Sequence, residues 1–193
     1  MRYGSKIKRI CYIAAAICIN YIGGQLALAL RLPIYLDSIG TLLISFLYGP
    51  ITGMLTPLIS GLLMAVTGDV FSLYFAPVGM ILGLVSGFVF KKYTKFNAWI
   101  FVVALIITIP GTLVCSIINA ILFHGVTSSG SSVLVQILSH TPLGLTGSIF
   151  VVQILTDYLD RLISAAIVLN ACRIPMFRNL KNQNTLKEKA PTK

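Results

Sequence analysis

Residues 98–123 read AWIFVVALIITIPGTLVCSIINAILF and contain no charged side chain. A transmembrane helix needs about 20 mainly apolar residues, because each residue adds about 1.5 Å along its axis. This stretch is long enough to cross a bilayer even with a kink at Pro110. The sequence therefore predicts an all-α protein, a six-helix transmembrane bundle. The other predicted spans cover about residues 8–30, 38–48, 51–66, 74–90 and from 147–155 to 172.

The overall composition agrees with a membrane bundle. Hydrophobic residues make up 56% of the chain, compared with about 45–50% in soluble domains, and charged residues make up only 10%, compared with about 25%. So few charges could not cover the surface of a soluble protein. We expect residues 1–176 to form one substrate-binding bundle and the polar, charged residues 177–193 to form a disordered basic cytoplasmic tail.

Lys and Arg lie in three clusters, at residues 1–9, at residues 91–95 and from Arg173 onward, and only Arg31 and Arg161 lie elsewhere. Basic clusters beside apolar spans mark cytoplasmic loops, so we expect a cell-membrane protein with both termini cytoplasmic. The pattern argues against a nucleic-acid groove. The long connection between helices five and six then lies outside, and its apolar run at residues 133–138 predicts a short extra helix.

Ionisable side chains within the spans are few, and each costs at least about 2.5 kcal/mol at the centre of a helix unless it is paired or wetted. Asp157 and Arg161 lie four apart on one helix face and can form a neutralising pair. A structural salt bridge and a ligand contact both remain open there. Asp37 could instead cap the second helix, and Asp69 could be a turn residue.

The predicted topology nevertheless gathers polar and aromatic side chains, Tyr35 among them, at the outer side of the bundle. Convergent groups of this kind above an apolar bundle are typical of a small-molecule pocket. The candidate substrate-binding residues are Asp37, Asp69, Tyr74, His140, Asp160 and Arg161.

Two predicted helices carry small residues four apart, a spacing that lets a neighbouring backbone approach closely. In the fourth span, this spacing favours packing inside the bundle. In the first span, internal packing and contact with another membrane protein are both open. The residues are Ala14, Cys18, Gly23 and Ala27 in the first span, and Gly79, Gly83 and Gly87 in the fourth.

Catalytic and metal-binding motifs are missing from the sequence. It contains no GxxxxGK(S/T) loop for ATP, no HExxH and no GxSxG, and its four cysteines form no CxxC pair. We therefore expect neither enzyme activity nor a metal or cofactor.

Three segments resemble the substrate-binding S components of energy-coupling factor (ECF) transporters. Residues 32–43 (LPIYLDSIGTLL) and 48–62 (YGPITGMLTPLISGL) resemble the family's first outer loop and its second and third helices. Residues 157–169 (DYLDRLISAAIVL) resemble the start of the last helix, where the family pattern reads PDK-L-I-S. Here Thr156 replaces the Pro, and both Asp157 and Asp160 match the acid, so which of the two faces the pocket is open.

The resemblance implies a six-helix protein that captures a vitamin, nucleobase, nucleoside or other small water-soluble micronutrient from outside. Such proteins dock through helix one on a transmembrane coupling subunit that is shared with two cytoplasmic ATPases. In that interpretation, the small residues of the first span form the partner contact. The rival interpretations are a membrane sensor or assembly subunit, and a self-sufficient secondary transporter.

Overall fold

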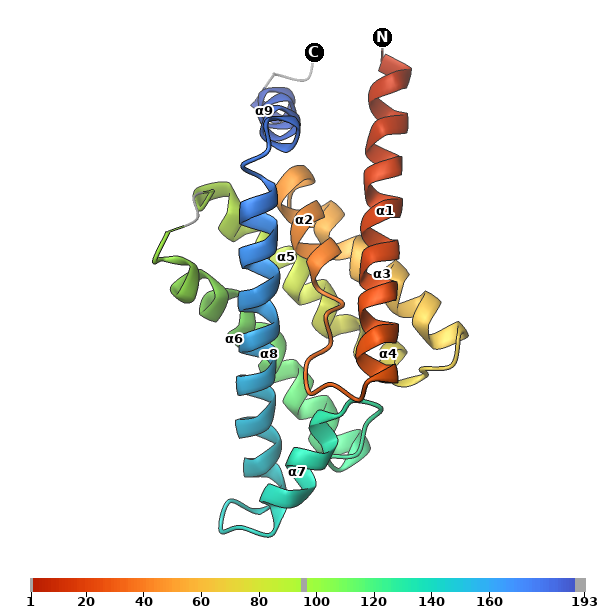
Figure 1. The fold of residues 1–193 in the computed structure, drawn as a ribbon, viewed down its shortest axis with the longest axis vertical. Helices are drawn as coiled ribbons and strands as arrows, with labels where there is room; N and C mark the ends of the chain where they lie inside the picture. Colours follow the sequence, from red (N-terminus) through yellow and green to blue (C-terminus); the bar gives the residue numbers. More distant parts are fainter. Residues whose placement is uncertain (1, 95–96, 190–193) are drawn as a thin grey trace.

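The computed structural model describes residues 2–94 and 97–189, and these ranges contain helices and no strand. The start of α1 and the last helix, α9, lie at the same end of the molecule, with α7 at the opposite end (Figure 1). The elements in chain order are α1 (Arg2–Ala29), α2 (Ile39–Tyr48), α3 (Pro50–Val66), α4 (Phe71–Tyr74), α5 (Ala76–Lys92), α6 (Ile100–Ile118), the π-helix η1 (Asn119–Phe123), α7 (Ser131–Ser139), α8 (Gly144–Ala171) and α9 (Pro175–Lys189).

The helical class predicted from the sequence is confirmed, and the short helix expected in the long connection is present as α7. Two stretches, residues 6–29 in α1 and residues 100–123 in α6 and η1, are long and apolar enough to cross a membrane. Helix α8 matches α1 in length, with 28 residues each, but it carries three charged side chains in its middle. The short helix α4 precedes the predicted fourth span, and α8 begins earlier than predicted.

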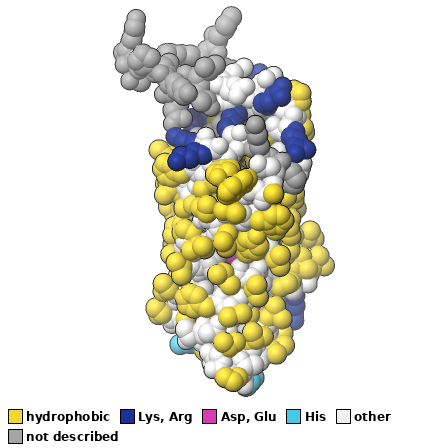
Figure 2. Space-filling model, turned by 90° about the vertical axis from the view of Figure 1, so that its left-hand side faces the viewer, with side chains coloured by type: hydrophobic (Ala, Val, Ile, Leu, Met, Phe, Trp, Pro, Cys, Tyr) yellow, Lys and Arg dark blue, Asp and Glu magenta, His cyan; other side chains and the backbone are white. Residues whose placement is uncertain are grey.

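Many large apolar side chains are exposed, and several polar side chains are buried beside the apolar core. Large apolar side chains such as Ile22, Phe101 and Leu113 are exposed, whereas Asn20 and Asp157 are buried. Exposed apolar surface of this extent marks contact with a membrane or with other proteins. Figure 2 shows the same arrangement on one face, where Lys and Arg gather toward the end that carries α9 and hydrophobic side chains cover most of the rest.

Helices α3 and α5 pack almost backbone to backbone. A Cβ atom on Gly83 would lie 2.2 Å from the carbonyl oxygen of Gly53, and one on Gly87 would lie 2.3 Å from the Cα of Pro50. Atoms that are not bonded cannot approach so closely, so both positions require glycine. The spacing of small residues in this span therefore serves packing inside the bundle.

The small residues of α1 divide into two pairs. Gly23 faces inward, because a Cβ there would lie 2.2 Å from the carbonyl oxygen of Leu36, and Ala27 is buried. Ala14 and Cys18 are exposed. Gly23 and Ala27 thus pack against the rest of the molecule, and the predicted partner contact of all four residues stays a prediction.

Residues 177–189 belong to helix α9, where the sequence predicted a disordered tail; residues 190–193 lie outside the described ranges. Phe177 and Leu180 pack against the core, and the Lys181 amine donates a hydrogen bond to the carbonyl oxygen of Phe90 at 2.9 Å. Asn184 donates to the carbonyl oxygen of Leu47 at 3.1 Å. These bonds satisfy carbonyls left open at the ends of α2 and α5. These inward-facing side chains are three to four residues apart, as expected on one face of a helix. The charged composition of the segment concealed this pattern in the sequence.

Lys181→Ala is expected to release α9 from the bundle. The variant loses the bond to Phe90 and the contact of the amine with the Phe46 ring, 3.6 Å from its centroid. A loss of about 1–2 kcal/mol raises the undocked fraction about five- to thirtyfold. Limited trypsin digestion should therefore cut faster after Arg178. The exposed Asn182→Ala provides the control, and equal cleavage rates in the two variants would show that Lys181 does not hold the helix.

Candidate functional site

A partly open cavity of about 80 Å³ lies inside the bundle, between helices α2, α3, α5, α6 and α8. A second, more open cavity of about 590 Å³ adjoins it and shares Asp69, Phe71 and Ser128 with it. The lining of the inner cavity combines apolar and polar side chains. The apolar ones include Pro57, Met64, Phe75, Val78 and Leu82, and the polar ones include Tyr35, Asp37, Thr41, Asp157 and Arg161.

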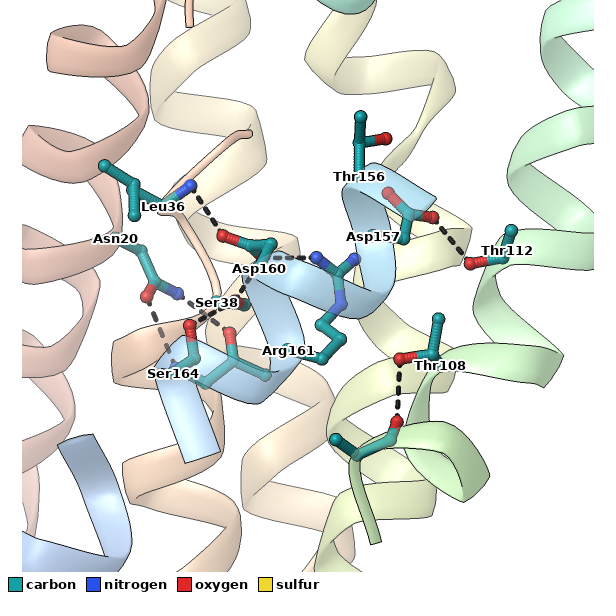
Figure 3. A network of polar contacts seen from close by, with 12 residues as sticks. Asn20, Leu36, Ser38, Thr108, Thr112, Thr156, Asp157, Asp160, Arg161 and Ser164 are labelled. Atoms are coloured by element: carbon teal, nitrogen blue, oxygen red, sulfur yellow. Dashed lines mark hydrogen bonds and ion pairs between the residues drawn. The ribbon is translucent and has the colours of Figure 1, made fainter. Parts of the chain in front are cut away.

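Asp160 joins α8 to the loop between α1 and α2. Its carboxylate accepts hydrogen bonds from the Leu36 backbone N–H at 2.9 Å and from the Ser38 hydroxyl at 2.6 Å, and it forms an ion pair with Arg161. Figure 3 shows these contacts converging on Asp160. Leu36 has a φ of 54°, an uncommon conformation for a residue other than glycine. The bond to Asp160 holds this turn in place, and with it the neighbouring Asp37.

Asp157 lies one helical turn from Asp160 and accepts a hydrogen bond from the Thr112 hydroxyl of α6 at 2.6 Å. Of the two carboxylates, Asp157 is the one that lines the cavity. The ion pair of Arg161 is with Asp160, so the pair expected between Asp157 and Arg161 is not the one observed. Contacts between elements explain this difference in pairing. The loop before α2 and Arg161 bring several donors to Asp160, while Thr112 of α6 donates to Asp157.

Asn20 fixes the start of α2 against α1. Its side-chain nitrogen donates to the Thr41 hydroxyl at 2.8 Å, and its oxygen accepts from the Gly40 backbone N–H at 2.7 Å. A Cβ on Gly40 would lie 2.1 Å from the carbonyl oxygen of Ala16, so the two helices touch at this point. These contacts place Thr41 at the wall of the cavity.

The structure brings together some of the predicted site residues. Asp37, Asp69 and Arg161 line the inner cavity, and Asp160 is paired with Arg161 beside it. Tyr74 and His140 do not line either cavity.

Tyr74 and His140 both lie outside the site because of how their helices pack. The Tyr74 ring is 49% exposed and packs on Phe123 of η1, with 5.4 Å between the ring centroids. His140 is exposed at the end of α7. The sequence predicted the end of the bundle on which these residues lie but not the direction of their side chains.

Several lining residues went unpredicted, among them Thr41, Ser60, Met64, Cys115 and Ser128. Thr41 and Ser60 carry hydroxyl groups within apolar spans, a weak signal because such groups also bond to the backbone of their own helix. Met64 and Cys115 look like ordinary packing residues in the sequence.

Asp69 lies where the two cavities meet. One of its oxygens accepts a hydrogen bond from the Ser72 hydroxyl at 2.5 Å, and the other is buried without a partner among the described residues. A buried acceptor without a donor is costly, so this oxygen of Asp69 indicates a site for a hydrogen-bond donor. Asp37 lines the inner cavity as well and is half-buried.

The described residues contain no cluster of three side chains suited to a metal ion. The cavity combines carboxylate and hydroxyl oxygens with apolar side chains, an arrangement typical of small-molecule binding sites.

Comparison of the chain with protein-family models, curated proteins and solved structures finds no match. Across the described residues, the fold and the site define a helical protein with many exposed apolar side chains and an internal cavity lined by carboxylates.

Proposed function

We propose that this protein is a membrane-embedded substrate-capture subunit for ATP-driven uptake of a small water-soluble micronutrient, an S component of the ECF type. Helices α1, α2, α3, α5, α6 and α8 are its six spans, and both termini are cytoplasmic. The observation that carries the proposal is the cavity inside the bundle, which is lined by carboxylates together with apolar side chains. A cavity of this kind within a lipid-facing bundle suits capture of a polar molecule from water.

The position of the charges supports this orientation. Lys91 lies in the last turn of α5, where Phe90 accepts a hydrogen bond from Lys181 of α9, and Arg173 lies two residues before α9. The lining of the wider cavity includes the connection into α7, the helix at the opposite end (Figure 1). Under the positive-inside rule, the wide cavity therefore faces the exterior. The short α2, only 10 residues long, does not need to span the bilayer alone, because the partly buried loop before it completes the crossing against the protein.

The partner surface in this proposal is the exposed side of α1. Ala14 and Cys18 are small and exposed there, which allows a helix of a transmembrane coupling subunit to approach closely. Two cytoplasmic ATPases associated with that subunit supply the energy. A secondary transporter is the alternative, since Asp157 is a buried carboxylate in a span and could carry a coupling ion.

Uptake measured with and without the ATPases distinguishes these alternatives. Cells that express the chain are supplied with an isotope-labelled mixture of vitamins, nucleobases and nucleosides, and the imported compounds are identified by mass spectrometry. We expect import of one compound that stops when the coupling subunit or either ATPase is removed. Import that continues without them and collapses with the ion gradient would instead indicate the secondary transporter.

A further inference from the structure

The acidic residues of this chain are concentrated at one place. The chain has five of them and a net charge of +10. Four lie in or beside the inner cavity, namely Asp37, Asp69, Asp157 and Asp160. Among the residues that line this cavity, the one basic side chain is Arg161, and its ion pair is with Asp160. A strongly basic protein thus has an acidic interior site.

The remaining three carboxylates form no contact ion pair with a described residue, and Arg161 is the one basic side chain among the cavity-lining residues. Asp37, Asp69 and Asp157 line the cavity, and none of them forms an ion pair with a residue in the described ranges. Asp69 is 9% exposed, and one of its oxygens has no hydrogen-bond partner. An unpaired carboxylate is unfavourable in a low-dielectric interior, because charge separated from water needs a counter-charge. A positive group that enters the cavity supplies this counter-charge.

We propose that the captured molecule carries a compact organic cation, such as a protonated amine, an amidinium or a charged heterocycle. This inference rests on the proposed function, because it names the substrate class of the same site. The inner cavity, about 80 Å³, admits a small charged group, and the adjoining cavity of about 590 Å³ holds the rest of the molecule. Asp69 lines both cavities and so lies beside both parts of the proposed ligand.

Two further features select an organic cation over a metal ion. Phe71 and Phe75 line the inner cavity, and the faces of aromatic rings attract organic cations. No three metal-binding side chains converge within the described residues. The charge of Arg161 does not oppose the ligand strongly, because Asp160 balances it at contact distance.

The test compares three probes of nearly equal shape on the full chain in lipid nanodiscs, after removal of any retained ligand. Benzamidine is a cation at neutral pH, benzamide is neutral and benzoate is an anion. We expect benzamidine to bind at least about tenfold more tightly than benzamide, with benzoate not binding, as measured by titration and thermal shift. Asp37→Asn and Asp157→Asn should each reduce this preference to less than about threefold. Tyr74→Phe, outside both cavities, should leave it unchanged.

The results separate this inference from the proposed function. Equal or tighter binding of benzamide or benzoate would overturn the cationic substrate class while leaving the cavity as a binding site. No binding of any probe at millimolar concentration would also overturn it, and the proposed function would then be judged by ligand retention in the purified protein. A preference for benzamidine that persists in both Asp variants would place the cation elsewhere and would likewise overturn the inference.

Discussion

Asp160→Asn lowers the free energy of unfolding by about 3–5 kcal/mol, the usual cost of removing one member of a buried ion pair. The Asp160 side chain is 1% exposed, and its three partners, Leu36, Ser38 and Arg161, all donate. Asparagine offers one acceptor oxygen in place of two, and its amide nitrogen faces donors. Arg161 keeps its charge but loses its counter-ion. Unfolding in mixed detergent micelles, followed by circular dichroism, measures the change.

A double-mutant cycle with Arg161→Met separates the ion pair from the loop contacts. The double variant removes the unpaired charge, so it should recover a large part of the stability lost by Asp160→Asn alone. Thr112→Val is the matched control, because it removes a hydroxyl that bonds to Asp157 rather than to Asp160. A loss below about 0.5 kcal/mol for Asp160→Asn would contradict the role given to this residue.

The second prediction with a large expected effect concerns Gly83→Val. We expect this substitution to prevent α3 and α5 from packing. Its Cβ would lie 2.2 Å from the Gly53 carbonyl oxygen and 2.7 Å from the Met54 backbone nitrogen, and backbone cannot rotate away as a side chain does. Overpacking costs about 1–3 kcal/mol or more, and separating the two helices also disrupts the cavity that they line. Size-exclusion chromatography should show little monodisperse protein.

Gly111→Ala in α6 is the control for a glycine with room around it. A Cβ at Gly111 would lie 3.6 Å from the Val78 Cγ1, which is an ordinary contact. This variant should purify like the unmodified protein and should unfold at a similar temperature. If Gly83→Val also purifies as a stable monomer with the same unfolding temperature, the close approach of α3 and α5 is not required for the fold.

Most of the helices could be predicted because long apolar runs bounded by Gly, Pro and basic residues leave few alternatives. Helix α9 could not, because its contacts are made by Lys181 and Asn184, whose polar side chains indicate solvent unless the carbonyls that they reach are known. Gly23 and Ala27 illustrate the same limit, since small residues fit equally well against a partner and against the chain's own loop.

The candidate site shows what the scarcity of charge can and cannot predict. Asp37, Asp69 and Arg161 could be found because ionisable residues in such a chain are rare and need partners. Which carboxylate pairs with Arg161 could not be found, because helical spacing favours Asp157 while the donors of the loop select Asp160. Tyr74 turns toward Phe123, a packing choice that no local pattern indicates.

The central claim, that the inner cavity holds a captured small molecule, is tested most directly by native mass spectrometry of the protein purified gently from nutrient-rich cells. Ser128→Trp places a bulky ring where the two cavities meet, and Val126→Trp puts the same ring on a nearby exposed position that lines neither cavity. We predict one retained small mass in the unmodified protein and in Val126→Trp, and none in Ser128→Trp. A retained mass in all three would contradict the placement of the site, and no retained mass or thermal shift with any nutrient pool would contradict the claim itself.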